Sequence, residues 1–322
     1  MTAVDPFRAR FPGVPRGAGH YESFFLKACH PGGGRAVWVR YTVHKRPGDV
    51  PTGSLWFTLF DASSDRPRAR KVTVAAPSAA AGDWIGVGEA RIGPGVARGA
   101  LDHIEWDLRF STVEPPLLHF PAGWMYRSPL PKTKLVSPAP AARFDGTLAL
   151  DGGSVAIEGW RGTIGHNWGS QHAERWIWLH ALSASGDWLD AAIARVRLGP
   201  ATTPWVANGA LSLGGVRHAL GGVGRRVQVR ETPQRCLFEL PGKRLRLRGE
   251  ISAAAEHFVG WLYADPDGGE HHTLNCSIAD VRIRVERRGE APLDLAVEAG
   301  AAYELGMREQ DHGMAIQPFP DG

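Results

Sequence analysis

One stretch of the chain, GTIGHNWGSQHAERWIWLHA (residues 162–181), concentrates side chains able to do chemistry or to bind a ligand. Glycines flank His166, Asn167 and Trp168, which is typical of a loop or bulge where the backbone bends sharply or approaches another group. Histidine and asparagine there would transfer or orient a proton. The alternative is that they only form hydrogen bonds inside the protein, and the sequence leaves both open.

The tail of this stretch, RWIWLHA (175–181), alternates as a strand does, so that Trp176, Trp178 and His180 should share one face. A polar loop beside such an aromatic wall is a good place for a ligand, although core packing alone explains most tryptophans. We expect the loop to lie where two domains meet, with a polar side chain at the mouth of a cavity lined by Trp176 and Trp178.

A second group of interest is Glu22 in YESFFLKA (21–28), where strand alternation places it beside Phe24 and Leu26. Burial disfavours the charged form of a carboxylic acid, which makes Glu22 a candidate proton donor. The structural alternative is that Glu22 pairs with an arginine of a neighbouring strand, for instance Arg40.

Metal and cofactor motifs do not occur. No spacing of His, Cys, Asp or Glu matches a standard zinc or iron pattern, and His166 and His172 are separated by Gly169, which makes them a weak pair. EHH (270–272) follows the turn DPDGG (265–269) and is expected in an exposed loop. Because nucleotide-binding glycine motifs and a nucleophile elbow are also missing, we expect neither metal nor cofactor.

Composition narrows the class of protein. A chain with 37 basic and 33 acidic residues carries a net charge of +4, too weak a field to predict nucleic acid as a partner. Three cysteines without a CxxC pair favour reduced thiols and a cytoplasmic location. The N-terminus lacks the apolar core of a signal peptide, and no apolar run is long enough for an integral membrane segment.

The pattern of the chain predicts an all-β protein. Forty glycines and 24 prolines separate short, alternating apolar runs, and helical periodicity is scarce. Closure into a barrel protects strand edges most completely, and a barrel of about eight strands is just wide enough for one small ligand. We therefore predict two tandem antiparallel β-barrel domains.

The proline-rich segment 128–148 is expected to interrupt any central strand and to connect the two domains. On either side, residues 35–61 and 174–196 share a pattern of an aromatic-rich strand, a Gly-Asp turn and a second strand, which indicates an internal duplication. The expected organisation is an N-terminal tail at 1–18, a first domain at 19–142 that includes the connector, and a second domain at 143–322.

Six segments together resemble the bacterial AttH-like family: YESFFLKA, AVWVRYTV, GSLWFTLFD, SPAPAARFDGTL, GWRGTIGHNWGSQHAERWIWLHA and DPDGGEHHTLNCSIADVRI. The resemblance runs from about Tyr21 to about Val285, and GHNWG with HAERWIW is its most specific part. The wider group includes carotenoid 1,2-hydratase (hydroxyneurosporene synthase), tocopherol cyclase and the fungal lipocalin-like Diels-Alderases. The resemblance implies two lipocalin-like barrels, with site residues at Glu22, His166, Asn167 and Trp168.

The isoprenoid members of this group imply protonation of an alkene to a carbocation, which aromatic faces stabilise. Glu22 or His166 would supply the proton, and Asn167 completes the expected catalytic set. The residues expected to contact a ligand are Trp38, Arg40, Trp168, His172, Trp176 and Trp178.

Three functions follow from these observations. The first is a cofactor-independent hydratase, cyclase or isomerase that acts on a lipophilic isoprenoid or polyketide-like molecule in a barrel cavity. The second is a non-catalytic carrier, because burial of apolar area alone drives binding. The third is an interaction module whose barrels are filled by their own side chains. The sequence leaves open the substrate, the barrel that holds it and the oligomeric state.

Overall fold

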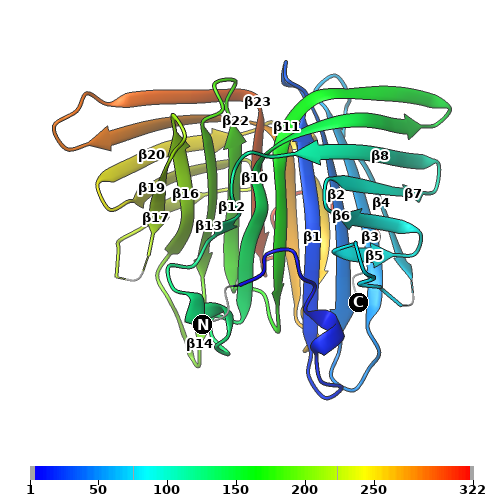
Figure 1. Ribbon diagram of the computed structural model, residues 1–322. Helices are drawn as coiled ribbons and strands as arrows, with labels where there is room; N and C mark the ends of the chain where they lie inside the picture. Colours follow the sequence, from blue (N-terminus) through cyan, green and yellow to red (C-terminus); the bar gives the residue numbers. More distant parts are fainter. Residues whose placement is uncertain (1–3, 75, 223, 320–322) are drawn as a thin grey trace.

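The computed structural model describes residues 4–74, 76–222 and 224–319, so that parts of the expected N-terminal tail and of the C-terminus lie outside it. The described chain is built of strands, with short 3-10 helices at η1 (Phe11–Gly13), η2 (Gly123–Tyr126) and η3 (Ala255–His257) (Figure 1). The predicted all-β, two-domain fold is confirmed. In this part of the chain no helix has the length and apolar character needed to cross a membrane.

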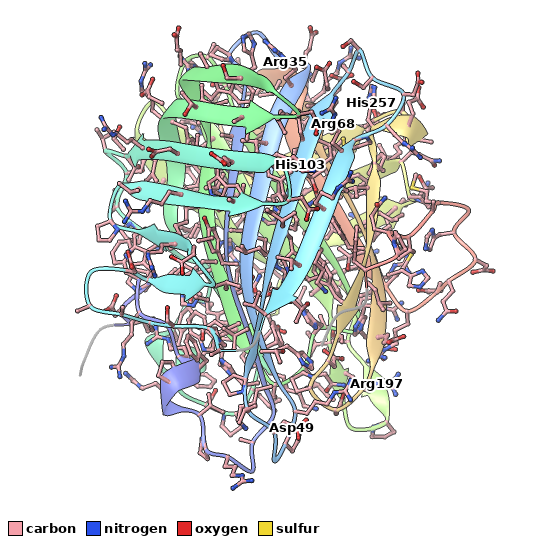
Figure 2. All side chains as sticks on the ribbon, turned by 90° about the vertical axis from the view of Figure 1, so that its right-hand side faces the viewer. Arg35, Asp49, Arg68, His103, Arg197 and His257 are labelled. Carbon is pink, nitrogen blue, oxygen red and sulfur yellow. The ribbon has the colours of Figure 1, made fainter. Side chains whose placement is uncertain are left out.

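The first sheet has eleven antiparallel strands in the order β4-β3-β2-β1-β11-β10-β8-β7-β6-β5, with β9 beside β10. The bounds are β1 (His20–Cys29), β2 (Arg35–Lys45), β3 (Thr52–Asp61), β4 (Arg68–Val74), β5 (Ile85–Val87), β6 (Ala90–Gly93), β7 (Val96–Leu101), β8 (Ile104–Ser111), β9 (Leu117–Leu118), β10 (Thr133–Leu150) and β11 (Gly153–Gly169). Figure 2 shows this sheet from the side, and its inward-facing apolar side chains form one buried cluster.

The second sheet has ten strands in the order β17-β16-β13-β12-β23-β22-β20-β19-β18, with β21 beside β22. The bounds are β12 (Arg175–Leu182), β13 (Trp188–Arg195), β16 (Val206–Leu213), β17 (Val216–Gly221), β18 (Gln228–Glu231), β19 (Arg235–Pro241), β20 (Leu245–Ser252), β21 (Val259–Ala264), β22 (Glu270–Arg287) and β23 (Leu293–Met307). The small hairpin β14 (Arg197–Leu198) and β15 (Ala201–Thr202) stands apart, and a bridge between Leu220 and Gly242 joins β17 to the end of β19.

The two sheets repeat one arrangement. In each, four meandering strands (β1 to β4; β12, β13, β16 and β17) pair through the first of them with the last long strand, β11 or β23. Both β10 and β22 have 18 residues and a register shift near the middle. A duplication is therefore visible in the topology. The sequence pattern, however, matched β2–β3 with β12–β13, whereas the topology matches β1–β2 with β12–β13. The two differ by one strand because aromatic hairpins recur within each sheet.

The proline-rich segment 128–148 does not connect two domains as we predicted. Residues Thr133–Leu150 form β10, which lies between β11 and β8 inside the first sheet. Pro138 and Pro140 fall within the register shift between Val136 and Ala142. At such an irregularity a strand can lack an amide donor without losing the pairing on either side, so proline does not end it.

The chain passes from one sheet to the other between Gly169 and Arg175, whereas the sequence led us to expect a domain boundary after residue 142. The strands β10 and β11, which the sequence divided between the domains, pair with each other along most of their length. Hydrogen bonding between long neighbouring strands therefore places this hairpin with the first sheet.

Strands β1 and β2 form a wall between two cores, and almost all of their residues are buried. One face, with Phe24, Leu26 and Val39, packs inside the first sheet. The opposite face, with Phe25 and Trp38, packs in one cluster with the second sheet. Because successive residues of a strand point to opposite sides, each side of this wall is specified by every second residue.

Aromatic rings lie over glycines of the neighbouring strand. The pairs are Phe25 with Gly165, Trp106 with Gly99, Trp176 with Gly306, and Phe238 with Gly249. A Cβ atom added at Gly306 would lie 2.1 Å from the ring of Trp176. The glycine thus leaves room for the ring to lie flat across the sheet.

We predict that Gly306→Ala forces the Trp176 indole out of its place and lowers the free energy of unfolding by about 1–3 kcal/mol, as overpacking does. Chemical denaturation measures this change. Gly17→Ala is the control, because a Cβ atom there meets no atom within 4 Å. Equal stability of the two variants would contradict the close packing of Trp176 on Gly306.

Candidate active site

A cavity of about 330 Å³ lies between the two sheets. Its walls come from β12, β13 and β16 of the second sheet, from β1, β2 and the end of β11 of the first, and from residues 119–135. Lys132 and Arg197 of the lining are exposed, and Figure 2 places Arg197 at the lower end of the molecule. The mouth of the cavity therefore lies near this end.

Aromatic rings form most of the inner wall. Trp38, Trp176 and Trp178 line it, and Phe25 meets Trp178 edge to face at 5.1 Å between ring centroids. The indole N–H of Trp178 donates to Asp190 Oδ1 at 3.0 Å, and that of Trp176 donates to Glu304 Oε1 at 2.9 Å. With both N–H groups held by carboxylates, the rings are fixed in place and offer apolar surface to a ligand.

Arg40 and Glu304 place charged groups against the aromatic inner wall. The Arg40 guanidinium lies over the ring of Tyr263, 4.1 Å from its centroid. Besides the bond from Trp176, the Glu304 carboxylate accepts a hydrogen bond at 3.1 Å from the side chain of Asn275 and one at 3.5 Å from Tyr263. These three neutral donors fix the carboxylate in position at the cavity wall.

His172 stands beside this polar corner, in the segment that joins the two sheets. Its ring stacks on Tyr21 with centroids 3.9 Å apart, and its Nδ1 lies 2.7 Å from Asp265 Oδ1. The backbone N–H of His172 also donates to Asp265 Oδ1. Burial raises the pKa of Asp265, but the hydrogen bond and charge of His172 outweigh it and hold this pKa below its ordinary value.

A buried chain of hydrogen bonds runs behind another part of the wall. His119 lines the cavity, and its Nε2 lies 3.0 Å from the Ser137 hydroxyl, which donates to Asp190 Oδ2 at 2.5 Å. Burial lowers the pKa of His119 and lowers that of His180 to about 4. His180 continues the aromatic face of β12, stacked near Trp178.

Many of the residues predicted from the sequence meet at this cavity. Those that line it are Trp38, Arg40, Asn167, His172, Trp176 and Trp178. The prediction of a loop or bulge at residues 166–168 is wrong, because these residues pair regularly within strand β11. Its glycines have a packing reason: Gly165 lies under the ring of Phe25, and a Cβ atom at Gly169 would meet the backbone of Lys132.

Glu22, His166 and Trp168 lie together on the other face of this wall and do not line the cavity. Glu22 is fully buried and accepts hydrogen bonds from the backbone N–H groups of Arg10 and Phe11, at 2.7 and 2.8 Å. His166 Nε2 lies 2.8 Å from Glu22 Oε1, and its Nδ1 lies 2.9 Å from the carbonyl oxygen of Pro6. These contacts fasten the N-terminal segment to the first sheet.

The state of Glu22 follows from these partners. Burial alone would raise its pKa, but hydrogen bonds from His166 and His20 lower the pKa to about 2. Glu22 is therefore held as a carboxylate, which is the reverse of the proton donor that burial predicts. Arg40, considered as its partner, points to the opposite side of β2, because Phe25 and not Glu22 is its neighbour on β1.

Sequence reasoning missed other residues of this region. Glu304 and Tyr263 line the cavity from β23 and β21, and neither belongs to a motif. His271 was expected in an exposed loop but is fully buried, because β22 already begins at Glu270. The alternation of polar residues that follows, with Thr273 and Asn275 on the same face as His271, was the available signal.

Comparison with known proteins identifies relatives in sequence and structures of the same fold. No family model matches the chain. Two uncharacterised proteins of Mycobacterium tuberculosis, from strains CDC 1551 and H37Rv, are each 27% identical over 339 residues, covering 95% of this chain and 96% of theirs.

Two crystal structures share the arrangement of strands. A candidate AttH protein from Nitrosomonas europaea has a TM-score of 0.57 at 12% identity, covering 96% of this chain and 99% of the other. Kievitone hydratase from Nectria haematococca has a TM-score of 0.54 at 11% identity, covering 92% and 90%. At these identities the chain has the same fold as both proteins.

We predict that Glu22→Gln destabilises the protein in a pH-dependent way. The pKa of Glu22 falls from an ordinary 4.5 to about 2 on folding, so its contribution is complete above about pH 4.5 and is lost as the pH falls toward 2. The variant should therefore lose about 3 kcal/mol of unfolding free energy at pH 7 and progressively less below pH 4.5.

Denaturant unfolding at several pH values measures this difference. Glu89→Gln is the control, since that side chain is fully exposed and should change stability little at any pH. A constant deficit of Glu22→Gln from pH 7 down to about pH 2.5 would show that the carboxylate charge is not what fastens the N-terminal segment.

Proposed function

We propose that this protein is a hydratase-type enzyme, which adds water to or removes water from a lipophilic small molecule held between the two sheets. The observation that carries the proposal is an aromatic cavity in which the Glu304 carboxylate and the Arg40 guanidinium lie against the inner wall. The resemblance to the AttH-like family and the fold shared with kievitone hydratase support it.

The chemistry follows from these two groups. The Glu304 carboxylate takes a proton from a water molecule, whose oxygen then forms a bond to one carbon of a polarised double bond. The second carbon then receives that proton from Glu304, which returns to its carboxylate form, so that one water molecule is added in all; elimination of water is the same path in reverse. Arg40 stabilises negative charge that develops on an oxygen of the substrate, because its guanidinium is fixed against Tyr263 in an apolar setting.

The substrate class follows from the size and lining of the cavity. About 330 Å³ lies in the range of small-molecule sites, and flat tryptophan faces suit an extended or ring-shaped apolar molecule. An isoprenoid or a polyketide-like compound fits this description. Since all three cysteines are buried and free, we infer a reducing, cytoplasmic setting for the reaction.

Reaction in water labelled with oxygen-18 tests the activity. The protein is incubated with an apolar extract of its native host, and mass spectrometry is used to search for compounds that gain one labelled water. We expect such a product with the wild-type protein and none with heat-denatured protein. A compound that is retained by the protein but never altered would instead support a carrier.

The substitution Glu304→Gln tests the proposed base. An amide still accepts the hydrogen bond from Trp176 but cannot take a proton, so we expect the rate to fall about 100- to 10,000-fold with little change in ligand affinity. The control Glu309→Gln changes an exposed carboxylate that follows the end of β23, and it should keep the wild-type rate. Full activity of Glu304→Gln would exclude Glu304 as the base.

A further inference from the structure

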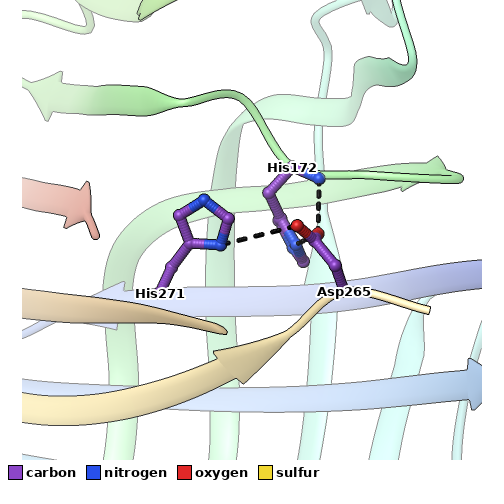
Figure 3. A group of neighbouring side chains, drawn as sticks. All are labelled: His172, Asp265 and His271. Atoms are coloured by element: carbon purple, nitrogen blue, oxygen red, sulfur yellow. Dashed lines mark hydrogen bonds and ion pairs between the residues drawn. The ribbon is translucent and has the colours of Figure 1, made fainter. Parts of the chain in front are cut away.

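Directly behind the cavity wall, three side chains from separate parts of the chain converge (Figure 3). His172 comes from the segment between the two sheets, Asp265 from the turn after β21, and His271 from the start of β22. His172 Nδ1 lies 2.7 Å from Asp265 Oδ1, and His271 Nδ1 lies 3.8 Å from Asp265 Oδ2. One ligand atom from each residue falls within 4.8 Å of the other two.

These groups are buried and incompletely paired. Asp265 and His271 are fully buried. Within the described chain, neither ring nitrogen of His271 has a hydrogen-bond partner, and the same holds for Asp265 Oδ2. Because buried polar atoms nearly always form hydrogen bonds, a histidine with none at either ring nitrogen, beside a carboxylate oxygen that also has none, points to a bound group. A cation would satisfy both kinds of atom by accepting their electron pairs.

Among the charged neighbours, Arg308 lies 3.6 Å from Asp265 Oδ2 and 3.2 Å from Glu174 Oε2, and Arg197 also pairs with Glu174 at 2.8 Å. The two carboxylates and the two guanidiniums therefore balance, and the donor atoms of the three side chains carry the case for a cation. Their distances are suitable, since ligand atoms bonded at about 2.0–2.2 Å to a tetrahedral ion stand about 3.3–3.6 Å apart. Sub-ångström shifts of the three side chains reach this spacing.

We propose that His172, Asp265 and His271 bind one divalent transition-metal ion. Two imidazole nitrogens and one carboxylate oxygen are the donor types that zinc and iron prefer in proteins. His172 also belongs to the cavity wall, so the ion would fix that wall and fasten the segment between the sheets to the second sheet. No spacing in the sequence indicates this site, because 93 residues separate His172 from Asp265.

Metal titration of the full chain tests the proposal without any substrate, so its failure and that of the proposed activity are separable. The protein is stripped with a chelator, and Zn²⁺ and Co²⁺ are added, with metal content measured by mass spectrometry and Co²⁺ by its visible absorption. We expect close to one ion per chain, a higher melting temperature with the ion, and the absorption of nitrogen- and oxygen-bound Co²⁺.

Variants locate the ion. His271→Ala and His172→Ala should each weaken binding at least tenfold, and two positions are tested so that one folding defect is not decisive. His312→Ala is the first control, because His312 Nε2 lies 2.8 Å from His272 Nδ1 and two imidazoles therefore meet there as well. His103→Ala, in the exposed turn labelled in Figure 2, is the second control.

Both controls should bind the ion as the wild type does. Loss of binding only in His312→Ala would move the metal to that pair and overturn the proposal. Substoichiometric binding by the wild type would also overturn it.

Discussion

The two-sided burial of β1 and β2 is the constraint on which the rest of this structure depends. A strand that is exposed on one side needs only one apolar face, whereas this wall must satisfy two interiors at once. On one side, Phe24 and Leu26 fill the first sheet, and Glu22 fastens the N-terminal segment. On the other, Phe25 and Trp38 pack against the second sheet and line the cavity.

The same wall explains why cavity lining and anchoring of the N-terminal segment alternate from one residue to the next. Asn167 faces the cavity, while its neighbours His166 and Trp168 face the N-terminal segment. A pair of polar residues next to each other in the sequence therefore serves two different purposes. Only the contacts of each side chain distinguish these purposes, because His166 and Trp168 are buried and Asn167 is half-buried.

Sequence periodicity predicted much of this arrangement. Alternation correctly separated Glu22 from Tyr21 and Phe25, and it placed Trp176 and Trp178 on a common face. It could not say which face of a doubly buried strand borders a cavity, because both faces are rich in apolar residues. The expectation for Glu22 failed for a related reason: burial was visible in the pattern, but the backbone N–H groups that stabilise its charge were not.

Sequence patterns could not predict contacts between segments that are distant along the chain. Glu304 reaches the cavity because β23 pairs with β12, and His271 reaches Asp265 because β22 begins immediately after the turn. The sequence did not predict strand β10, because prolines normally interrupt a central strand. Here Pro138 and Pro140 lie at the register shift, where the pairing does not need their missing amide donors. In each case strand pairing across the chain, and not local composition, decides where the side chain lies.

The central claim is that the space between the two sheets is open and apolar, while the first sheet is filled by its own side chains. Diffraction from crystals pressurised with xenon tests it directly, because xenon enters dry apolar cavities and is located by its anomalous scattering. We predict a xenon site among Trp38, Trp176 and Trp178. Xenon bound only beside Glu22 and His166, or nowhere in the molecule, would contradict this account.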